Sequence, residues 1–146
     1  MASKPFSFEE FINIYSKVPR ICVDLVIETK KGILLTKRAI NPWKGFWHTP
    51  GGTVLLNEKL EHTVKRVAKE ELNIAVSIEK MLGVLEFFYD FKNYSTHDIS
   101  VVFLVRPKSG DIKLDKQADE WKVFRTLPKK MITLHRRFLK EKLKIH

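Results

Sequence analysis

The chain has 146 residues, 44% of them apolar, which predicts one domain (1–146) that buries about two-thirds of its unfolded surface. Its 27 Lys and Arg against 17 Asp and Glu give a formal charge of +10, a field that attracts polyanions without choosing among nucleotides, nucleic acid and acidic lipid. A single cysteine, Cys22, excludes an internal disulfide, and no run reaches the roughly 18 apolar residues that cross a bilayer.

The first elements predicted along the chain are a helix and a β-hairpin. Ser7 with Glu10 three residues later is a capping-box pattern, and it predicts a short amphipathic helix that Pro19 ends. Branched apolar residues over 21–29 and 33–37, on either side of a Lys-Lys-Gly turn, predict the hairpin. The initial segment MASKPFSFEEF lacks the apolar run of a signal peptide, and with the single cysteine this favours the cytoplasm.

The second half predicts strands and then a final helix. Residues 76–86, 87–90 and 98–105 are strand candidates, and the last is apolar enough to be buried on both faces. Residues 131–145 predict a helix with Leu134, Phe138 and Leu139 turned inward. No linker or repeat divides the chain, and periodicity alone predicts an α/β or α+β fold.

Between the hairpin and the later strands, the segment from Gly52 to Ile74 holds most of the candidate chemistry. A helix of 3.6 residues per turn places Arg66 one turn before Glu70, so the cation can orient that carboxylate while Glu71 lies along another edge of the same face. Two fixed carboxylates beside a glycine turn suit a hard cation such as Mg2+, which takes other ligands from water and substrate phosphates. The residues predict metal-assisted chemistry on a phosphate compound.

This segment, 52–74, resembles the Nudix box, the signature of hydrolases that cleave nucleoside diphosphates linked to another group. Two positions depart from the family pattern: Val67 stands where a Glu is usual, and Asn73 where a Gly is usual. Asn tolerates a left-handed helix end, so the second departure is mild. Val67 precedes Glu71 by four residues on the same helical face, where much of the family has a further metal ligand or the base. The matching positions are Gly52, Glu58, Arg66, Ala68, Glu70, Glu71 and Ile74.

Over nearly its whole length, the chain also resembles the GDP-mannose mannosyl hydrolase branch of that family. The likeness is carried by VPRICVDLVIETKKGILLTKRAINPWKGFWHTPGG, by GVLEFFYD, by the Thr96-His97 pair and by Gln117 in an acidic loop. The resemblance implies an α/β fold, namely an α/β/α sandwich with a central mixed β-sheet. It also implies a homodimer.

The same resemblance implies a site for one Mg2+ ion, or Mn2+, held by the Gly51 carbonyl, Glu71 and Gln117, with Glu70 as a further candidate ligand. The branch's base is a His directly after that Gln, where this chain has Ala118. Losing a general base costs roughly 100-fold or more in rate.

Arg38 and Asp24 are candidate substrate-binding residues. Arg38 ends a strand beside a proline loop, where a guanidinium can fork onto a phosphate; the alternative is an ordinary surface arginine. Asp24 lies inside an apolar strand, so it needs a partner. It could hold a sugar hydroxyl or a base edge, or pair with a Lys or Arg. His48 and His97 lack the spacing of a zinc site and are interpreted as structural.

Several alternatives stay open around the box. Glu58 has two interpretations: it is one of the positions that match the Nudix box pattern, or simply an acidic residue in the first helical turn, where the helix dipole favours negative charge. Gly51 and Gly52 fit a plain tight turn as well as close approach of a backbone carbonyl to an ion. Asp119 and Glu120, in the same loop as Gln117, are candidates for the missing base.

The predicted function is Mg2+-dependent hydrolysis of a nucleoside diphosphate derivative, with a nucleotide-sugar such as GDP-mannose preferred and with Arg66, Glu70 and Glu71 as catalytic residues. Attack at the sugar carbon would release an intact nucleoside diphosphate. Attack at phosphorus would match a pyrophosphohydrolase of nucleoside triphosphates or ADP-ribose-like compounds. Val67 weakens the second route and Ala118 the first. The third alternative is a protein that binds a nucleotide without turnover.

The basic tail, residues 129–146, holds seven Lys or Arg and a single Glu. Its apolar residues fall at core spacing, so the run is interpreted as the solvated face of a helix. Nucleic-acid binding would require exposed aromatic residues interleaved with the basic ones. We therefore expect a small-molecule partner, without specific nucleic acid and without a membrane.

Overall fold

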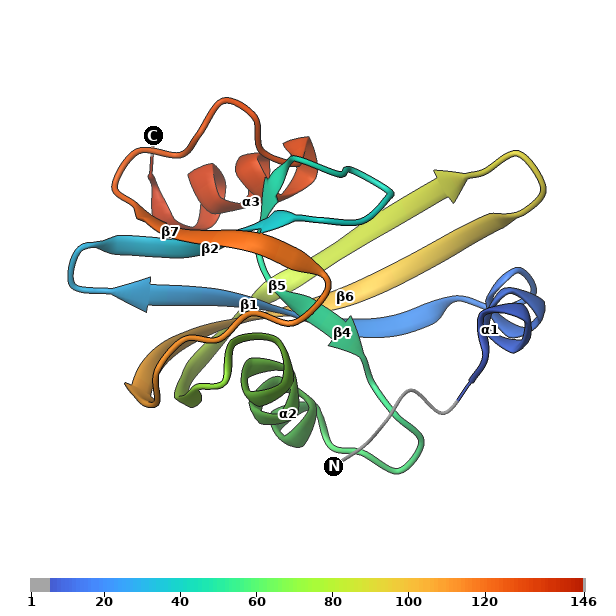
Figure 1. Ribbon diagram of the computed structural model, residues 1–146, viewed down its shortest axis with the longest axis horizontal. Helices are drawn as coiled ribbons and strands as arrows, with labels where there is room; N and C mark the ends of the chain where they lie inside the picture. The colour runs from blue at the N-terminus through green and yellow to red at the C-terminus, as the bar shows by residue number, and fades with distance from the viewer. Residues whose placement is uncertain (1–5, 146) are drawn as a thin grey trace.

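The computed structural model describes residues 6–145 and shows a seven-stranded mixed sheet with α2 (Leu60–Leu72) on one face and α3 (Thr133–Leu143) on the other (Figure 1). The predicted α/β/α sandwich is confirmed. The strand order is β3-β2-β1-β6-β5, with β4 paired to β1 and β7 to β2. The strands are β1 (Arg20–Thr29), β2 (Gly32–Arg38), β3 (Trp47–His48), β4 (Gly51–Thr53), β5 (Ala75–Asp90), β6 (Ser95–Ser109) and β7 (Ala118–Phe124).

The centre of the sheet is the parallel pair β1 and β6, aligned from Arg20 opposite Asp98 to Ile27 opposite Val105. Alternation along β1 sends Val23 and Leu25 under α2 and Val26 under α3, so the strand contributes to two separate cores. Residues 102–105 of β6 are buried on both faces, as predicted from their continuous apolar run.

Strand β1 has two different partners along one edge. Its residues 27–29 pair with β2, whereas its residues 22–24 pair with β4, the glycine strand. The amide of Leu25 donates to the carbonyl of Pro50 (2.8 Å), which closes the gap between the two partners. Because β4 takes over from β2 as the partner of β1, Gly51 lies directly opposite Asp24.

The N-terminal helix α1 (Phe8–Tyr15) has the predicted capping box. Ser7 Oγ accepts from the amide of Glu10 (3.1 Å), and Glu10 Oε1 accepts from the amide of Ser7 (3.2 Å). The helix lies at one end of the molecule beside the β5–β6 hairpin (Figure 1), and the ring of Phe8 contacts that of Tyr94 edge-on. Residues 1–5 of the initial segment, which bear on the signal-peptide expectation, lie outside the described residues.

Several predicted boundaries were wrong. Residues 76–86 and 87–90 are one strand, β5, whose bulges near Gly83 interrupt the apolar alternation without breaking the pairing with β6. Helix α3 starts at Thr133 because Met131 bridges Trp47 and the amide of Ile132 donates to the Trp47 carbonyl (3.0 Å). Leu134 is only half-buried.

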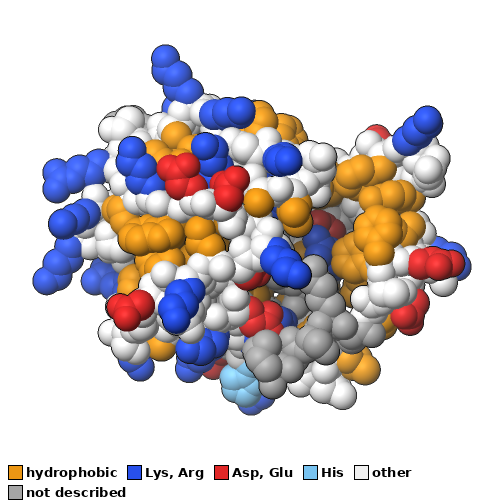
Figure 2. Space-filling view, viewed as in Figure 1, with side chains coloured by type: hydrophobic (Ala, Val, Ile, Leu, Met, Phe, Trp, Pro, Cys, Tyr) orange, Lys and Arg blue, Asp and Glu red, His pale blue; other side chains and the backbone are white. Residues whose placement is uncertain are grey.

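On the face shown in Figure 2, many basic side chains stand out on the side where the β1–β2 turn and α3 lie, around an apolar patch. A second group of apolar side chains lies at the opposite end, over α1 and the β5–β6 hairpin. Within residues 6–145, no helix is long and apolar enough to span a membrane.

Candidate metal and active site

Helix α2 presents the candidate carboxylates, and its C-terminal end is fixed by Asn73. Asn73 adopts the left-handed conformation (φ 58°), and its amide donates to Lys69 (3.0 Å) while that of Ile74 donates to Ala68 (3.3 Å). The expectation that Asn could replace the family's Gly here is confirmed. Asn73 also holds the following loop, because its side-chain amide donates to the carbonyl of Asp111 (3.1 Å).

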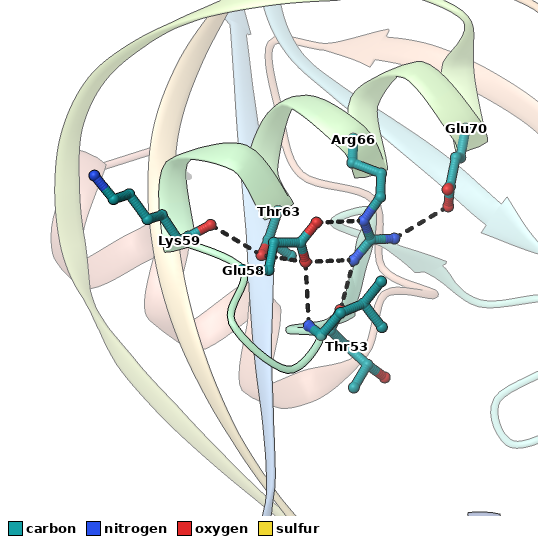
Figure 3. Close-up of polar contacts among 7 residues, drawn as sticks. Thr53, Glu58, Lys59, Thr63, Arg66 and Glu70 are labelled. Carbon is teal, nitrogen blue, oxygen red and sulfur yellow. Dashed lines mark hydrogen bonds and ion pairs between the residues drawn. The ribbon is translucent and has the colours of Figure 1, made fainter. Parts of the chain in front are cut away.

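Arg66 braces the loop before α2 against the helix (Figure 3). Its guanidinium donates to both oxygens of Glu58, at 2.7 and 2.9 Å, and to the carbonyl of Thr53 at 2.7 Å. It also reaches Glu70 one turn further on (3.2 Å), the contact predicted from their spacing. Glu58 lies just before the helix rather than in its first turn, and it also accepts from Thr63 Oγ1 (2.7 Å). Hydrogen bonds from Arg66 and Thr63 lower the pKa of Glu58 to about 2.

Glu70 and Glu71 each have a buried oxygen without a hydrogen-bond partner among the described residues, Oε1 of Glu70 and Oε2 of Glu71. Burial raises the pKa of Glu71 well above its usual range, and the nearby Asp115 and Asp24 raise it further, with Arg38 opposing them. A buried carboxylate oxygen without a partner is costly unless a cation or a proton satisfies it. Within residues 6–145, no three His, Cys, Asp or Glu side chains are already gathered as a metal cage.

The Gly51 turn lies directly against Asp24. A Cβ on Gly51 would lie 2.5 Å from Asp24 Oδ1, so only glycine fits. Asp24 accepts from Thr49 Oγ1 (3.3 Å) and Ser100 Oγ (2.5 Å), and His135 Nε2 lies 3.8 Å from its Oδ2. The alternative that a Lys or Arg pairs with Asp24 was wrong for the described residues, because its partners are two hydroxyls and a histidine.

Arg38 ends β2 without a carboxylate partner within ion-pair distance among the described residues. Its Nε donates to the carbonyl of Pro42 (2.6 Å), and its own carbonyl accepts from the amide of Gly45 (2.8 Å). Burial lowers its pKa, while the charges of Tyr89 and Glu71 favour the protonated form. Arg38 is therefore a partly buried cation on the same side as Glu71, with donors left for an anion.

Gln117 lies next to this cation through its backbone, since its carbonyl accepts from the amide of Ala39 (2.8 Å). No described residue hydrogen-bonds its side chain. Asp115 was not singled out from the sequence, and its amide donates to the carbonyl of Glu71 (3.3 Å). Tyr89 was not singled out either; it lies near Arg38, and burial raises its pKa to about 12. An acidic residue two positions before Gln117 was the available signal for Asp115.

The two histidines interpreted as structural have different settings: His48 is buried, and His97 is half-exposed on the surface. His48 stacks on His135 (centroids 6.0 Å apart), and burial lowers its pKa well below the usual value. His97 stacks on Phe88 (4.3 Å) and lies 3.0 Å from Glu86. His135 was not singled out, yet its Nδ1 accepts from the amide of Thr49 (3.3 Å), so α3 holds the turn that leads to Gly51.

Comparison with known proteins identifies the family. The family profile described as "NUDIX domain" matches residues 18–142. The chain belongs to the Nudix family. It is 40% identical over 120 residues to the low-salt glycan biosynthesis protein Agl8 of Haloferax volcanii, covering 80% of this chain and 77% of that protein. It is 36% identical over 113 residues to an ADP-ribose pyrophosphatase of Methanocaldococcus jannaschii, covering 76% of this chain and 66% of that protein.

A solved structure shows the same fold. The MutT Nudix hydrolase of Burkholderia pseudomallei superposes with a TM-score of 0.74 at 30% identity, covering 86% of this chain and 98% of that chain. This chain is thus a Nudix hydrolase. Nudix hydrolases generally use a divalent cation such as Mg2+ or Mn2+. The residues here fit one, because two buried carboxylate oxygens, Oε1 of Glu70 and Oε2 of Glu71, lack a hydrogen-bond partner among the described residues.

The two departures from the Nudix pattern have different structural settings. Val67 is 2% exposed and packs into the core under α2, with Cγ2 only 2.8 Å from where a Gly52 Cβ would be. Ala118 is the first residue of β7, so Asp119 and Glu120 lie on a strand paired with β2. The expectation that these two residues lie in a loop was wrong, and Glu120 pairs with Lys37 (3.4 Å).

Proposed function

We propose that this Nudix hydrolase is Mg2+-dependent and acts on a nucleoside diphosphate linked to another group, with a nucleotide-sugar such as GDP-mannose as its substrate. The observation that carries the proposal is the pair of unpartnered buried oxygens on Glu70 and Glu71, close to the unpaired cation Arg38. Carboxylates in that state are suited to a cation, and a free guanidinium is suited to a phosphate.

In the proposed site, Glu71, Glu70, the Gly51 carbonyl and Gln117 would hold the cation, which when bound neutralises charge on the diphosphate. Arg38 donates to a phosphate oxygen of the substrate. Arg66 acts through Glu70. It donates to Oε2 of Glu70, and Oε1 of the same carboxylate keeps no hydrogen-bond partner among the described residues.

Two further parts of the proposal concern Asp24 and the oligomeric state. Asp24 supports the backbone at Gly51, and we keep it as a candidate substrate-binding residue, although Thr49 and Ser100 already donate to its two oxygens. We also propose that the protein is a homodimer and that its binding partner is the small nucleoside diphosphate derivative.

The proposal has two versions, which differ in the atom that water attacks: the sugar carbon or a phosphorus of the diphosphate. Likeness to the mannosyl hydrolase branch outside the box and to a glycan biosynthesis protein supports attack at the sugar carbon. Likeness to an ADP-ribose pyrophosphatase supports attack at phosphorus. Neither Val67 nor Ala118 can serve as a base, so water must be activated by another group, and Asp119 and Glu120 remain the candidates named from the sequence.

The test is turnover of GDP-, ADP- and UDP-sugars, nucleoside triphosphates and dinucleotides with Mg2+ in oxygen-18 water. Label in the sugar product means attack at carbon, and label in a phosphate product means attack at phosphorus. Glu71→Gln should abolish turnover, whereas Glu61→Gln, a change on the exposed face of the same helix, should leave it unchanged.

A second candidate function is nucleotide binding without turnover. It is favoured by one observation: both positions that supply a base in related enzymes are apolar here, Val67 and Ala118. Thermal stabilisation by a nucleotide, with no product from any compound of the panel, would support this function and reject hydrolysis.

A further inference from the structure

We propose that the indole ring of Trp43 stacks on the nucleobase of the substrate while Arg38 binds its diphosphate. This inference rests on the proposed function, because it assigns a contact to another part of the same nucleoside diphosphate derivative. It concerns the loop that joins β2 to β3, residues 39–46, for which the proposed function names no role.

The first support is the hydrogen bonding that ties this loop to Arg38. The Arg38 amide donates to the carbonyl of Phe46 (3.0 Å), and the Arg38 carbonyl accepts from the amide of Gly45 (2.8 Å). The side chain takes part as well, since its Nε donates to the carbonyl of Pro42 (2.6 Å). That carbonyl belongs to the peptide group that links Pro42 to Trp43. The backbone at Trp43 is therefore held directly against the guanidinium.

The second support is the backbone conformation of Trp43, which has φ 68°. A bulky side chain rarely adopts this left-handed region, and Trp43 is the one aromatic residue at positive φ in the part of the chain that the structure describes. Its carbonyl accepts from the amide of Phe46 (3.0 Å), so a tight turn imposes the conformation. Unfavourable backbone conformations of this kind persist where the surroundings fix them, and they cluster at ligand-binding sites.

The third support is that packing in the core does not account for this indole. Trp43 is 39% exposed and is a member of neither hydrophobic core, whereas Trp47 packs against the core beneath α3. Its ring contacts that of Phe46 edge-on, with the centroids 5.1 Å apart. The loop therefore holds a large aromatic side chain partly in solvent, beside a cation.

The chemistry of this pair fits a nucleotide. The other N–H groups of the Arg38 guanidinium make no hydrogen bond within residues 6–145, so they can donate to phosphate oxygens. An exposed aromatic ring suits the flat face of a nucleobase, and such stacking stabilises binding without selecting one base. A cation and an indole held by one loop thus match the phosphate and the base of a nucleoside diphosphate.

The experiment measures, by calorimetry in Mg2+, the binding of GDP, inorganic pyrophosphate and mannose 1-phosphate to the full chain. Trp43→Ala should weaken GDP binding by about tenfold, the loss of one base–aromatic stack, and leave the other two affinities within about twofold of the wild type. Trp43→Phe keeps an aromatic ring, so it should retain most of the affinity for GDP. Trp121→Ala removes another exposed indole, on β7, and as the matched control should bind all three compounds like the wild type.

Tryptophan fluorescence provides a readout that a purely structural role would not change. GDP should quench the emission of the wild type and of Trp121→Phe, and it should leave the emission of Trp43→Phe unchanged. Wild-type affinity for GDP in Trp43→Ala, an equal loss for pyrophosphate, or a loss confined to mannose 1-phosphate would overturn this inference and leave the proposed function standing. If the wild type binds neither GDP nor pyrophosphate, the proposed function itself fails.

Discussion

Arg66 joins three parts of the Nudix box through one side chain: the Thr53 carbonyl, the Glu58 carboxylate and Glu70. The contact with Glu70 was predictable, because residues four apart on a helix are neighbours. The contacts with Glu58 and Thr53 were not, since they depend on how the loop before α2 folds back. Spacing within one helix therefore predicted the Glu70 contact, whereas the Glu58 and Thr53 contacts became known only from the structure.

Glu58 should make stability depend on pH. Its pKa falls from 4.5 to about 2 in the folded state, so its contribution is present above about pH 4.5 and is lost as the pH falls through about 2. We expect Glu58→Gln to lower the free energy of unfolding at pH 7 by about 1 to 2 kcal/mol, after allowance for solvent screening.

The measurement is urea denaturation of both proteins between pH 7 and low pH. The difference between wild type and Glu58→Gln should shrink steadily toward acid. A difference that stays constant with pH would mean that the Glu58 charge is not its source.

Val67 should not tolerate the glutamate that much of the family has at this position. The side chain is 2% exposed and packs beneath Gly52, so Val67→Glu would bury a carboxylate among apolar groups. We expect a loss of about 3 kcal/mol or more in unfolding free energy and no gain in turnover. Val67→Thr, which is nearly the same shape, is the control and should cost about 1 to 2 kcal/mol by the same urea measurement. A stable Val67→Glu with faster turnover would show that a side chain at position 67 can reach the reacting groups.

Among the strands, those with a strong apolar pattern in the sequence were predicted. Strands that are held mainly by hydrogen bonds to a neighbouring strand were not. β1, β2 and β6 carry continuous branched residues. β7 reads ADEWKVF and is mostly exposed, because it is held by pairing with β2 rather than by burial. β3 and β4 are two and three residues long, which is too short for any periodicity. The omission of β7 is also why Asp119 and Glu120 were expected in a loop.

The end of α2 should depend on both the backbone and the side chain of Asn73. Ala is disfavoured in the left-handed conformation, and Asn73→Ala also removes two side-chain hydrogen bonds, the one that Lys69 Nζ donates to Asn73 Oδ1 (2.9 Å) and the one that Asn73 donates to the Asp111 carbonyl. We expect a loss of about 1 to 2 kcal/mol in unfolding free energy. Asn73→Gly keeps the backbone conformation, so it should lose less. Thermal unfolding of the three proteins checks the order, which would be contradicted if Gly were as costly as Ala.

At the scale of the whole molecule, the site is assembled from segments far apart in the sequence. In the proposed site, Glu71 comes from α2, Arg38 from the end of β2, Gly51 from the start of β4 and Gln117 from the segment just before β7. The split partnership of β1 with β2 and β4 brings these together, and no local pattern predicts it. The resemblance to the family was what connected Gly51, Arg38 and Glu71 before the fold was known.

The formal charge of +10 should act on the rate of substrate capture rather than on the chemical step. Basic side chains project from the side where α3 lies (Figure 2), and raising the ionic strength from about 0.01 M to about 0.1 M shortens the screening length from about 30 Å to about 10 Å. We expect kcat/KM for an anionic nucleotide-sugar to fall severalfold over this range while kcat changes little. Partly buried charges such as Arg38 are screened less than exposed ones, so the loss reflects the surface field. Lys140→Glu with Lys142→Glu, both on α3, should flatten the salt dependence of kcat/KM and leave kcat unchanged. An equal fall in kcat would instead place the salt effect within the site, at the contact between Arg38 and the diphosphate.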